Sequence, residues 1–155
     1  MIAISESAQV DVPAAELWGV VEDYALDVRW RSGIVEMTPN PPGPPVVGSK
    51  IHEVTRSAGR TYVTDSIIES VGPDYQYRFS GSGDSGRVSG GRSVVPITNG
   101  SAEVTYDVEL GLSGVLRLAK PLVATMMRRT LRRDLAALKT LIEEGGLTPS
   151  PPTDD

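Results

Sequence analysis

Hydrophobic positions along this 155-residue chain recur with two different periods, and the period changes in a definite order. Residues 2–10 alternate between apolar and polar side chains, which predicts a half-buried first strand. Apolar residues from Leu17 to Tyr24 then recur at helical spacing and predict a short helix. A second short helix is expected over residues 24–29, ending near Trp30.

The middle of the chain alternates with a period of two and is divided by turn residues, so it predicts a series of strands. The expected strands cover residues 34–37, 46–56, 60–71, 75–80, 87–97 and 101–112. In the fourth of these, Tyr75, Tyr77 and Phe79 share one face. Residues 39–45 contain five prolines and are expected to form a loop, because proline lacks the N–H that a strand ladder needs.

The end of the chain returns to the helical period and predicts one long amphipathic helix over residues 113–144. Its apolar stripe consists of Met127, Leu131, Leu135, Leu138 and Ile142. Pro121 interrupts the pattern, which predicts a kink or a separate short helix before Leu122. We therefore expect one α+β domain over residues 1–145 and a disordered, proline-rich acidic tail over residues 146–155.

Composition excludes several kinds of site. The chain has no cysteine, so it forms no disulfide and holds no thiolate metal site, which fits a reducing cytoplasm. The single histidine, His52, is too few for a histidine-based metal site. The net charge of −5 argues against nucleic-acid binding. No apolar stretch approaches the roughly 18 residues of a membrane span, and no signal peptide is recognisable at the N-terminus.

Charge is nevertheless uneven, because the final helix is rich in arginine and lysine. A solvated helix face explains this composition, and so does a surface that contacts anionic lipid or an acidic partner. Peripheral contact with a membrane is therefore compatible with the sequence.

Several local segments, taken in order, resemble one family. They are residues 10–18 at the entry to the first helix, Trp30 after an acidic short helix, residues 47–49, Gly72–Pro73 before an aromatic strand, residues 114–117 with Pro121–Leu122, and residues 133–143. Together they resemble the START-like (SRPBCC) superfamily, which is the polyketide cyclase/dehydrase and lipid-transport group. The resemblance covers residues 2–144.

This resemblance implies the helix-grip fold, in which a curved, antiparallel, seven-stranded sheet wraps around a long C-terminal helix, with two short helices after the first strand. A cavity between sheet and helix is also implied. The family includes lipid and sterol carriers, plant hormone receptors, aromatic polyketide cyclases and accessory subunits of carbon monoxide dehydrogenase, so the fold does not fix the function. The family has no shared catalytic triad, and we expect neither a cofactor nor a metal.

The residues expected to line the cavity are those on the aromatic strand face and opposite it, namely Trp30, Tyr62, Tyr77, Phe79 and Met127. Each is also explained as ordinary core, since the lining of such a cavity is the core face itself. Methionine and tyrosine suit an adaptable apolar cavity with a few hydroxyl contacts.

Candidates for acid–base chemistry are few. His52 is either a surface polar residue or a general base in the cavity. Asp65 points inward beside Tyr62 only if a bulge resets the strand alternation, and otherwise it is outward and solvated. Arg78 and Arg92 are suited to hold an acidic ligand, but outward ion pairs are the expectation for both.

Three functions are therefore compatible with the sequence. The first is binding of a hydrophobic or aromatic small molecule, lipid-like or polyketide-like, in the internal cavity. The alternative is a polyketide aromatase/cyclase in which a polar cavity residue transfers protons. The third is a non-catalytic interaction module that docks through the basic face of the last helix.

Overall fold

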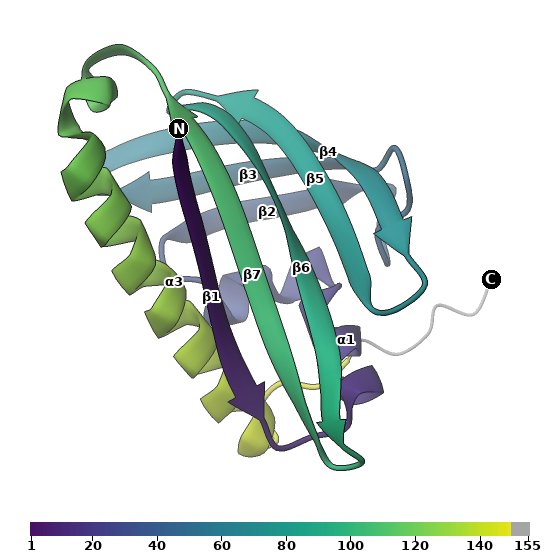
Figure 1. Cartoon of the computed structure of the whole chain (residues 1–155). Coiled ribbons are helices and arrows are strands. Elements are labelled where there is room, and N and C mark those ends of the chain that lie inside the picture. Colours follow the sequence, from purple (N-terminus) through teal and green to yellow (C-terminus); the bar gives the residue numbers. More distant parts are fainter. Residues whose placement is uncertain (150–155) are drawn as a thin grey trace.

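The computed structural model describes residues 1–149, which form seven strands and a set of helices in the predicted order (Figure 1). The N-terminal elements are β1 (Ile2–Val10), α1 (Ala14–Val21), the 3₁₀ helix η1 (Tyr24–Leu26) and α2 (Asp27–Trp30). The strands that follow are β2 (Ile34–Asn40), β3 (Lys50–Ser57), β4 (Arg60–Gly72), β5 (Gln76–Gly83), β6 (Gly86–Thr98) and β7 (Ser101–Leu112). The chain continues with the 3₁₀ helix η2 (Gly114–Ala119) and the long helix α3 (Lys120–Glu143).

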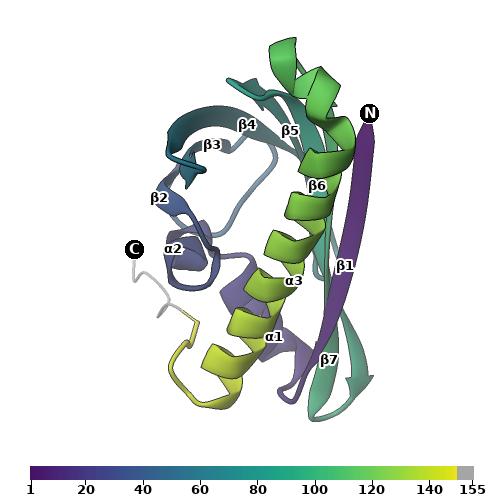
Figure 2. The same ribbon diagram turned by 90° about the vertical axis from the view of Figure 1, so that its left-hand side faces the viewer.

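The strands form one antiparallel sheet in the order β1-β7-β6-β5-β4-β3-β2. The helices α1 and α2 carry the chain from one edge of this sheet to the other, so β1 and β2 end up farthest apart. The sheet curves around α3, which lies along β1 (Figures 1 and 2). This is the predicted helix-grip arrangement.

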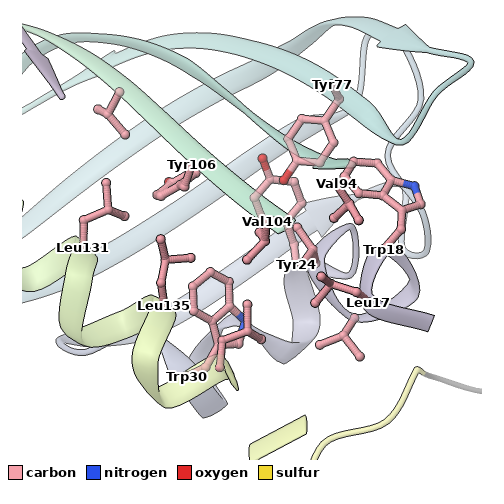
Figure 3. Packing of buried hydrophobic residues seen from close by; sticks show 14 of the residues in the cluster. Leu17, Trp18, Tyr24, Trp30, Tyr77, Val94, Val104, Tyr106, Leu131 and Leu135 are labelled. Atoms are coloured by element: carbon pink, nitrogen blue, oxygen red, sulfur yellow. The ribbon is translucent and has the colours of Figure 1, made fainter. Parts of the chain in front are cut away.

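The core fills the space between the inner face of the sheet and the helices. The predicted stripe on α3 is confirmed at Leu131, Leu135, Leu138 and Ile142, which are all buried, whereas Met127 is half-buried. Facing them are buried side chains of the sheet and the short helices, several of which are shown in Figure 3. The hydrophobic periodicity therefore identified the buried helix face correctly.

The glycines of β5 and β6 allow the sheet to curve. A Cβ atom at Gly81 would lie 2.2 Å from the carbonyl oxygen of Asp65, and one at Gly90 would lie 2.2 Å from that of Asp107. Both distances are far shorter than a real contact, so only glycine permits this approach of neighbouring strands.

Several boundaries differ from the sequence prediction. The strand expected from Val46 begins only at Lys50, and the strands expected over residues 34–37 and 75–80 each extend three residues further, to Asn40 and Gly83. The loop expected from Pro39 begins two residues later. Because β2 is an edge strand with a neighbour on one side only, it tolerates Pro39, which has no N–H to donate to a second strand. The tail expected from Gly146 includes Leu147, which is buried in the core, while residues 150–155 lie outside the described part of the chain. The predicted interruption before Leu122 is confirmed by the change from η2 to α3.

Candidate functional site

A buried ion pair lies on the inner face of the sheet. Arg92, on β6, donates from Nη1 to Oδ1 of Asp27 at 2.9 Å and from Nη2 to Oδ2 of the same carboxylate. Its Nη1 also donates to the carbonyl oxygen of Val21 at 3.0 Å. The two side chains are only 1% and 0% exposed, so this bidentate pair is desolvated and fixes the start of α2 against the sheet.

Aromatic rings surround the guanidinium group of Arg92. Its central carbon lies 4.9 Å from the ring centroid of Tyr24, 5.2 Å from that of Trp30 and 4.8 Å from that of Tyr106. The ring of Tyr77 lies 5.7 Å from that of Tyr24, and Figure 3 shows Tyr77 reaching from the sheet toward the short helices. We call these four aromatic residues the aromatic cage. Cation–π attraction adds to the ion pair in holding Arg92 inside.

Three polar atoms in this region are buried without a hydrogen-bond partner among the described residues: Nε1 of Trp30, the hydroxyl of Tyr77 and Nε of Arg92. An unpaired buried group of this kind costs about 1–3 kcal/mol, so it calls for an explanation. The indole and guanidinium nitrogens can only donate, and burial raises the pKa of Tyr77, which keeps its hydroxyl protonated. The cage therefore offers donors suited to an acceptor oxygen.

A second arginine completes the charge balance. Arg31 donates from Nη1 to Asp27 at 3.1 Å and to Glu53 on β3 at 3.0 Å, and its guanidinium lies 5.7 Å from the Tyr106 ring centroid. Burial alone would raise the pKa of Glu53, but Arg31 outweighs it and lowers that pKa below its usual value. The two arginines and two carboxylates thus neutralise one another inside the domain.

The same region is tied to α3. The backbone N–H of Ser32 donates to Oδ1 of Asp134 at 3.0 Å, and the Ser32 hydroxyl donates to the same oxygen at 2.7 Å. Burial raises the pKa of Asp134, while these two hydrogen bonds act in the opposite direction. The contact positions α3 over the end of α2, beside the aromatic cage.

The five residues predicted to line a cavity are only partly brought together. Trp30 and Tyr77 belong to the cage, and Phe79 contacts it through a ring-centroid distance of 6.5 Å to Tyr106. Met127 packs half-buried against the same core, whereas Tyr62 is half-buried on β4 and lies outside that cluster. Their ligand-binding role stays a prediction.

Two surface hollows are found on the domain, and neither is lined by any of these five residues. One lies on β2 to β5 and has a volume of about 620 Å³, and the other, of about 430 Å³, lies where β7 meets η2. Neither hollow reaches the aromatic cage.

Arg92 and its surroundings were not found from the sequence. The expectation of an outward ion pair was wrong for Arg92, whereas Arg78 does form one, donating to Asp107 at 2.8 and 2.9 Å. Gly90 and Gly91 obscured the alternation of β6. Arg92 nevertheless stands two residues before the buried Val94, and residues two apart on a strand lie on the same face of the sheet. This spacing was the sequence signal that could have placed Arg92 on the inner face.

The acid–base candidates His52 and Asp65 lie on the outer face of the sheet, away from the cage. They are register partners on β3 and β4, and Nδ1 of His52 lies 2.6 Å from Oδ1 of Asp65. The side chains are 42% and 72% exposed, and the register of β3 with β4 is continuous, so no bulge turns Asp65 inward. The hydrogen bond to Asp65 raises the pKa of His52. Both residues line the larger hollow, together with Ser80 and Ser82.

Within residues 1–149, no group of three or more His, Asp or Glu side chains is placed to hold a metal ion. Over the same residues, no helix combines the length and the apolar character that crossing a bilayer requires.

Comparisons with known proteins agree with this architecture. A START superfamily protein from Mycobacterium smegmatis is similar over 93% of this chain and 99% of its own, with 18% identity and a TM-score of 0.75. A protein from Thermus thermophilus gives 14% identity and a TM-score of 0.79, over 92% of this chain and 98% of its own. An aromatase/cyclase from Streptomyces sp. R1128 gives 14% identity and a TM-score of 0.74, over 92% of this chain and 93% of its own. At these identities the likeness shows the fold alone.

No match was found among the curated proteins. The sequence profile of the family described as polyketide cyclase/dehydrase and lipid transport matches residues 1–143, which is nearly the whole chain. The profile and the helix-grip fold agree, and the chain belongs to the polyketide cyclase/dehydrase and lipid transport family.

Proposed function

We propose that this protein binds a hydrophobic or aromatic small molecule that carries a hydrogen-bond acceptor, between the inner face of the sheet and α3. The observation that carries the proposal is the set of three unpartnered buried atoms on Trp30, Tyr77 and Arg92. A carbonyl or carboxylate oxygen of a ligand would satisfy such donors and remove their desolvation cost.

Apolar contact would supply most of the affinity. Burial contributes about 25 cal/mol per Å², so a ligand burying roughly 200 Å² of apolar surface gains about 5 kcal/mol before ordering costs. Neither surface hollow reaches the cage, so core side chains would have to move apart to admit the ligand. The cage donors would then orient the molecule rather than provide its main binding energy.

A second candidate is the aromatase/cyclase activity, and one observation favours it: the charged pair of Arg92 and Asp27 is buried in the same core as the Tyr77 hydroxyl. The protonated hydroxyl of Tyr77 and the charge of Arg92 would stabilise an enolate oxygen that develops on a poly-β-keto chain. Cyclisation by this route needs the same cage as simple binding does.

The first experiment is native mass spectrometry of the protein purified from its own host, to identify a co-purifying small molecule. A parallel titration with anilinonaphthalene sulfonate, an aromatic probe with acceptor oxygens, compares Tyr77→Phe and Trp30→Phe with Tyr75→Phe. Tyr75 is half-buried beside Trp18 and serves as the matched control. The two cage variants should each weaken probe binding by roughly 2–10-fold, the value of one hydrogen bond.

Equal affinity in all three variants, together with no co-purified molecule, would overturn the binding proposal. Turnover of a reactive polyketide surrogate distinguishes the second candidate. Loss of turnover by about 10²–10⁴ in Tyr77→Phe, with binding retained, would favour the cyclase. A similar loss in His52→Ala or Asp65→Asn would instead place proton transfer on the outer face of the sheet.

A further inference from the structure

Figure 1 shows the end of the molecule where β7 passes through η2 into α3. Large apolar side chains are exposed in this segment. Val115 and Leu118 on η2 are 75% and 89% exposed, and Leu122 and Met126 on α3 are 63% and 45% exposed. Leu122 and Met126 are four residues apart, so they share one face of α3, distinct from the face that buries Leu131 against the sheet. We call these four residues the apolar ridge. Exposed apolar groups gathered in this way mark an interaction surface.

The segment of the chain that carries the ridge has charges of a single sign. Residues 113–133 contain six of the 15 lysines and arginines of the chain and none of its 20 aspartates and glutamates. These cations are Arg117, Lys120, Arg128, Arg129, Arg132 and Arg133. Arg132 pairs with Glu6 at 3.0 Å, and no other member of the six forms an ion pair within residues 1–149. On a chain with a net charge of −5, this is a local cationic surface.

The hollow of about 430 Å³ adjoins the ridge. Arg117 and Lys120 line it together with apolar side chains at the ends of β1 and β7, including Ile2 and Leu112. A depression that combines cations with an apolar floor suits an anionic headgroup joined to an acyl chain.

We propose that η2 and the first turns of α3 dock onto the surface of an anionic phospholipid bilayer. The apolar ridge enters the boundary between headgroups and acyl chains, while Arg117, Lys120 and Arg129 contact lipid phosphates. This inference concerns the exterior of the domain and does not depend on the proposed ligand site.

Charge and apolar exposure together favour a membrane over other occupants. A symmetric contact with a second copy would bring the six cations against their own equivalents, which is unfavourable. Nucleic acid would satisfy the cations but would leave Leu118 and Leu122 without an apolar environment. An anionic bilayer satisfies both kinds of group at once.

The test is co-sedimentation of the whole chain with vesicles of phosphatidylcholine alone and of phosphatidylcholine mixed with phosphatidylglycerol. The protein should bind the anionic vesicles at least about tenfold more tightly, and about 0.5 M salt should weaken that binding by screening the cations. Leu118→Ser/Leu122→Ser and Arg117→Gln/Lys120→Gln should each lower binding about tenfold or more.

Matched controls come from exposed residues elsewhere. Val95→Ser/Ile97→Ser removes two side chains of β6 that are 57% and 49% exposed, and Lys50→Gln/Arg60→Gln removes two cations outside the ridge and its adjoining hollow. Both controls should bind vesicles as the unmodified chain does. Circular dichroism and thermal unfolding establish that every variant is folded.

Three results would overturn the proposal. One is the absence of sedimentation with anionic vesicles at low salt. Another is an equal loss of binding in the control and ridge variants. The third is a dimer, measured by light scattering, that dissociates in Leu118→Ser/Leu122→Ser, because it would assign the ridge to a second copy of the chain.

Discussion

Replacing Asp27 with asparagine removes the negative charge that pairs with Arg92 and also with Arg31 inside the domain. The Arg92 side chain is 1% exposed, and within residues 1–149 its only ion pair is the bidentate one with Asp27. Breaking a buried pair by neutralising one partner costs about 3–5 kcal/mol, because the remaining charge is left uncompensated away from water. This is a large share of the roughly 5–15 kcal/mol that stabilises a domain.

The assay is equilibrium unfolding in urea, followed by tryptophan fluorescence. With a slope of about 2 kcal/mol per M, the expected loss lowers the midpoint of Asp27→Asn by about 2 M. The control is Asp107→Asn, which breaks the pair with Arg78 on the outer face, where the two side chains are 33% and 48% exposed. An exposed pair contributes about 0–1 kcal/mol, so the control midpoint should move by less than about 0.5 M.

A second substitution tests the cause. Arg92→Met in the Asp27→Asn background removes the uncompensated charge and should recover much of the lost stability, since apolar replacements of buried pairs are often neutral or better. If Asp27→Asn costs no more than the outer-face control, or if Arg92→Met rescues nothing, then the buried charge does not stabilise this domain in the way described.

Three further outcomes are expected. Leu135→Asp, at a position 1% exposed, should unfold the domain, whereas Asp at the exposed neighbour Ala136 should change the free energy of unfolding by about 0.5 kcal/mol or less, and chemical denaturation measures both. Tyr77→Phe removes an unpartnered hydroxyl, so the free protein should gain up to about 1 kcal/mol in stability, and a clear loss would contradict the assignment. The pKa of His52, measured by NMR, should lie above about 6.5 and return toward that value in Asp65→Asn. Because the folded pKa is the higher one, the stability from this pair is present below about pH 6.5 and is lost as the pH rises through the folded pKa.

The fold could be predicted because its signals are local and repeated. The alternation of apolar and polar residues predicted all seven strands, and the apolar stripe that ends at Ile142 predicted the buried face of α3. The contact of His52 with Asp65 was also within reach, because the tight turn between Ser57 and Arg60 sets the register that pairs them.

The aromatic cage could not be predicted in the same way. Asp27 and Arg92 are 65 residues apart in the sequence, and no periodicity links a helix start to one position on β6. A charged side chain is also expected at the surface, since arginine is almost never fully buried unless it is paired. Recognising the pair required knowing which elements meet across the core.

The placement of β1 beside β7 has a consequence for how the chain folds. The hydroxyls of Ser7 and Thr105, 2.8 Å apart, join residues separated by 98 positions, so β1 has no ladder partner until almost the whole sheet exists. During synthesis at about 5–20 residues per second, this strand would wait roughly 5–20 s for its partner. Closure of the sheet is therefore a late, long-range step that slows folding. The polar residues Ser5, Ser7 and Gln9 on alternate positions interrupt the apolar character of β1. This lowers its tendency to aggregate while it is still unpaired.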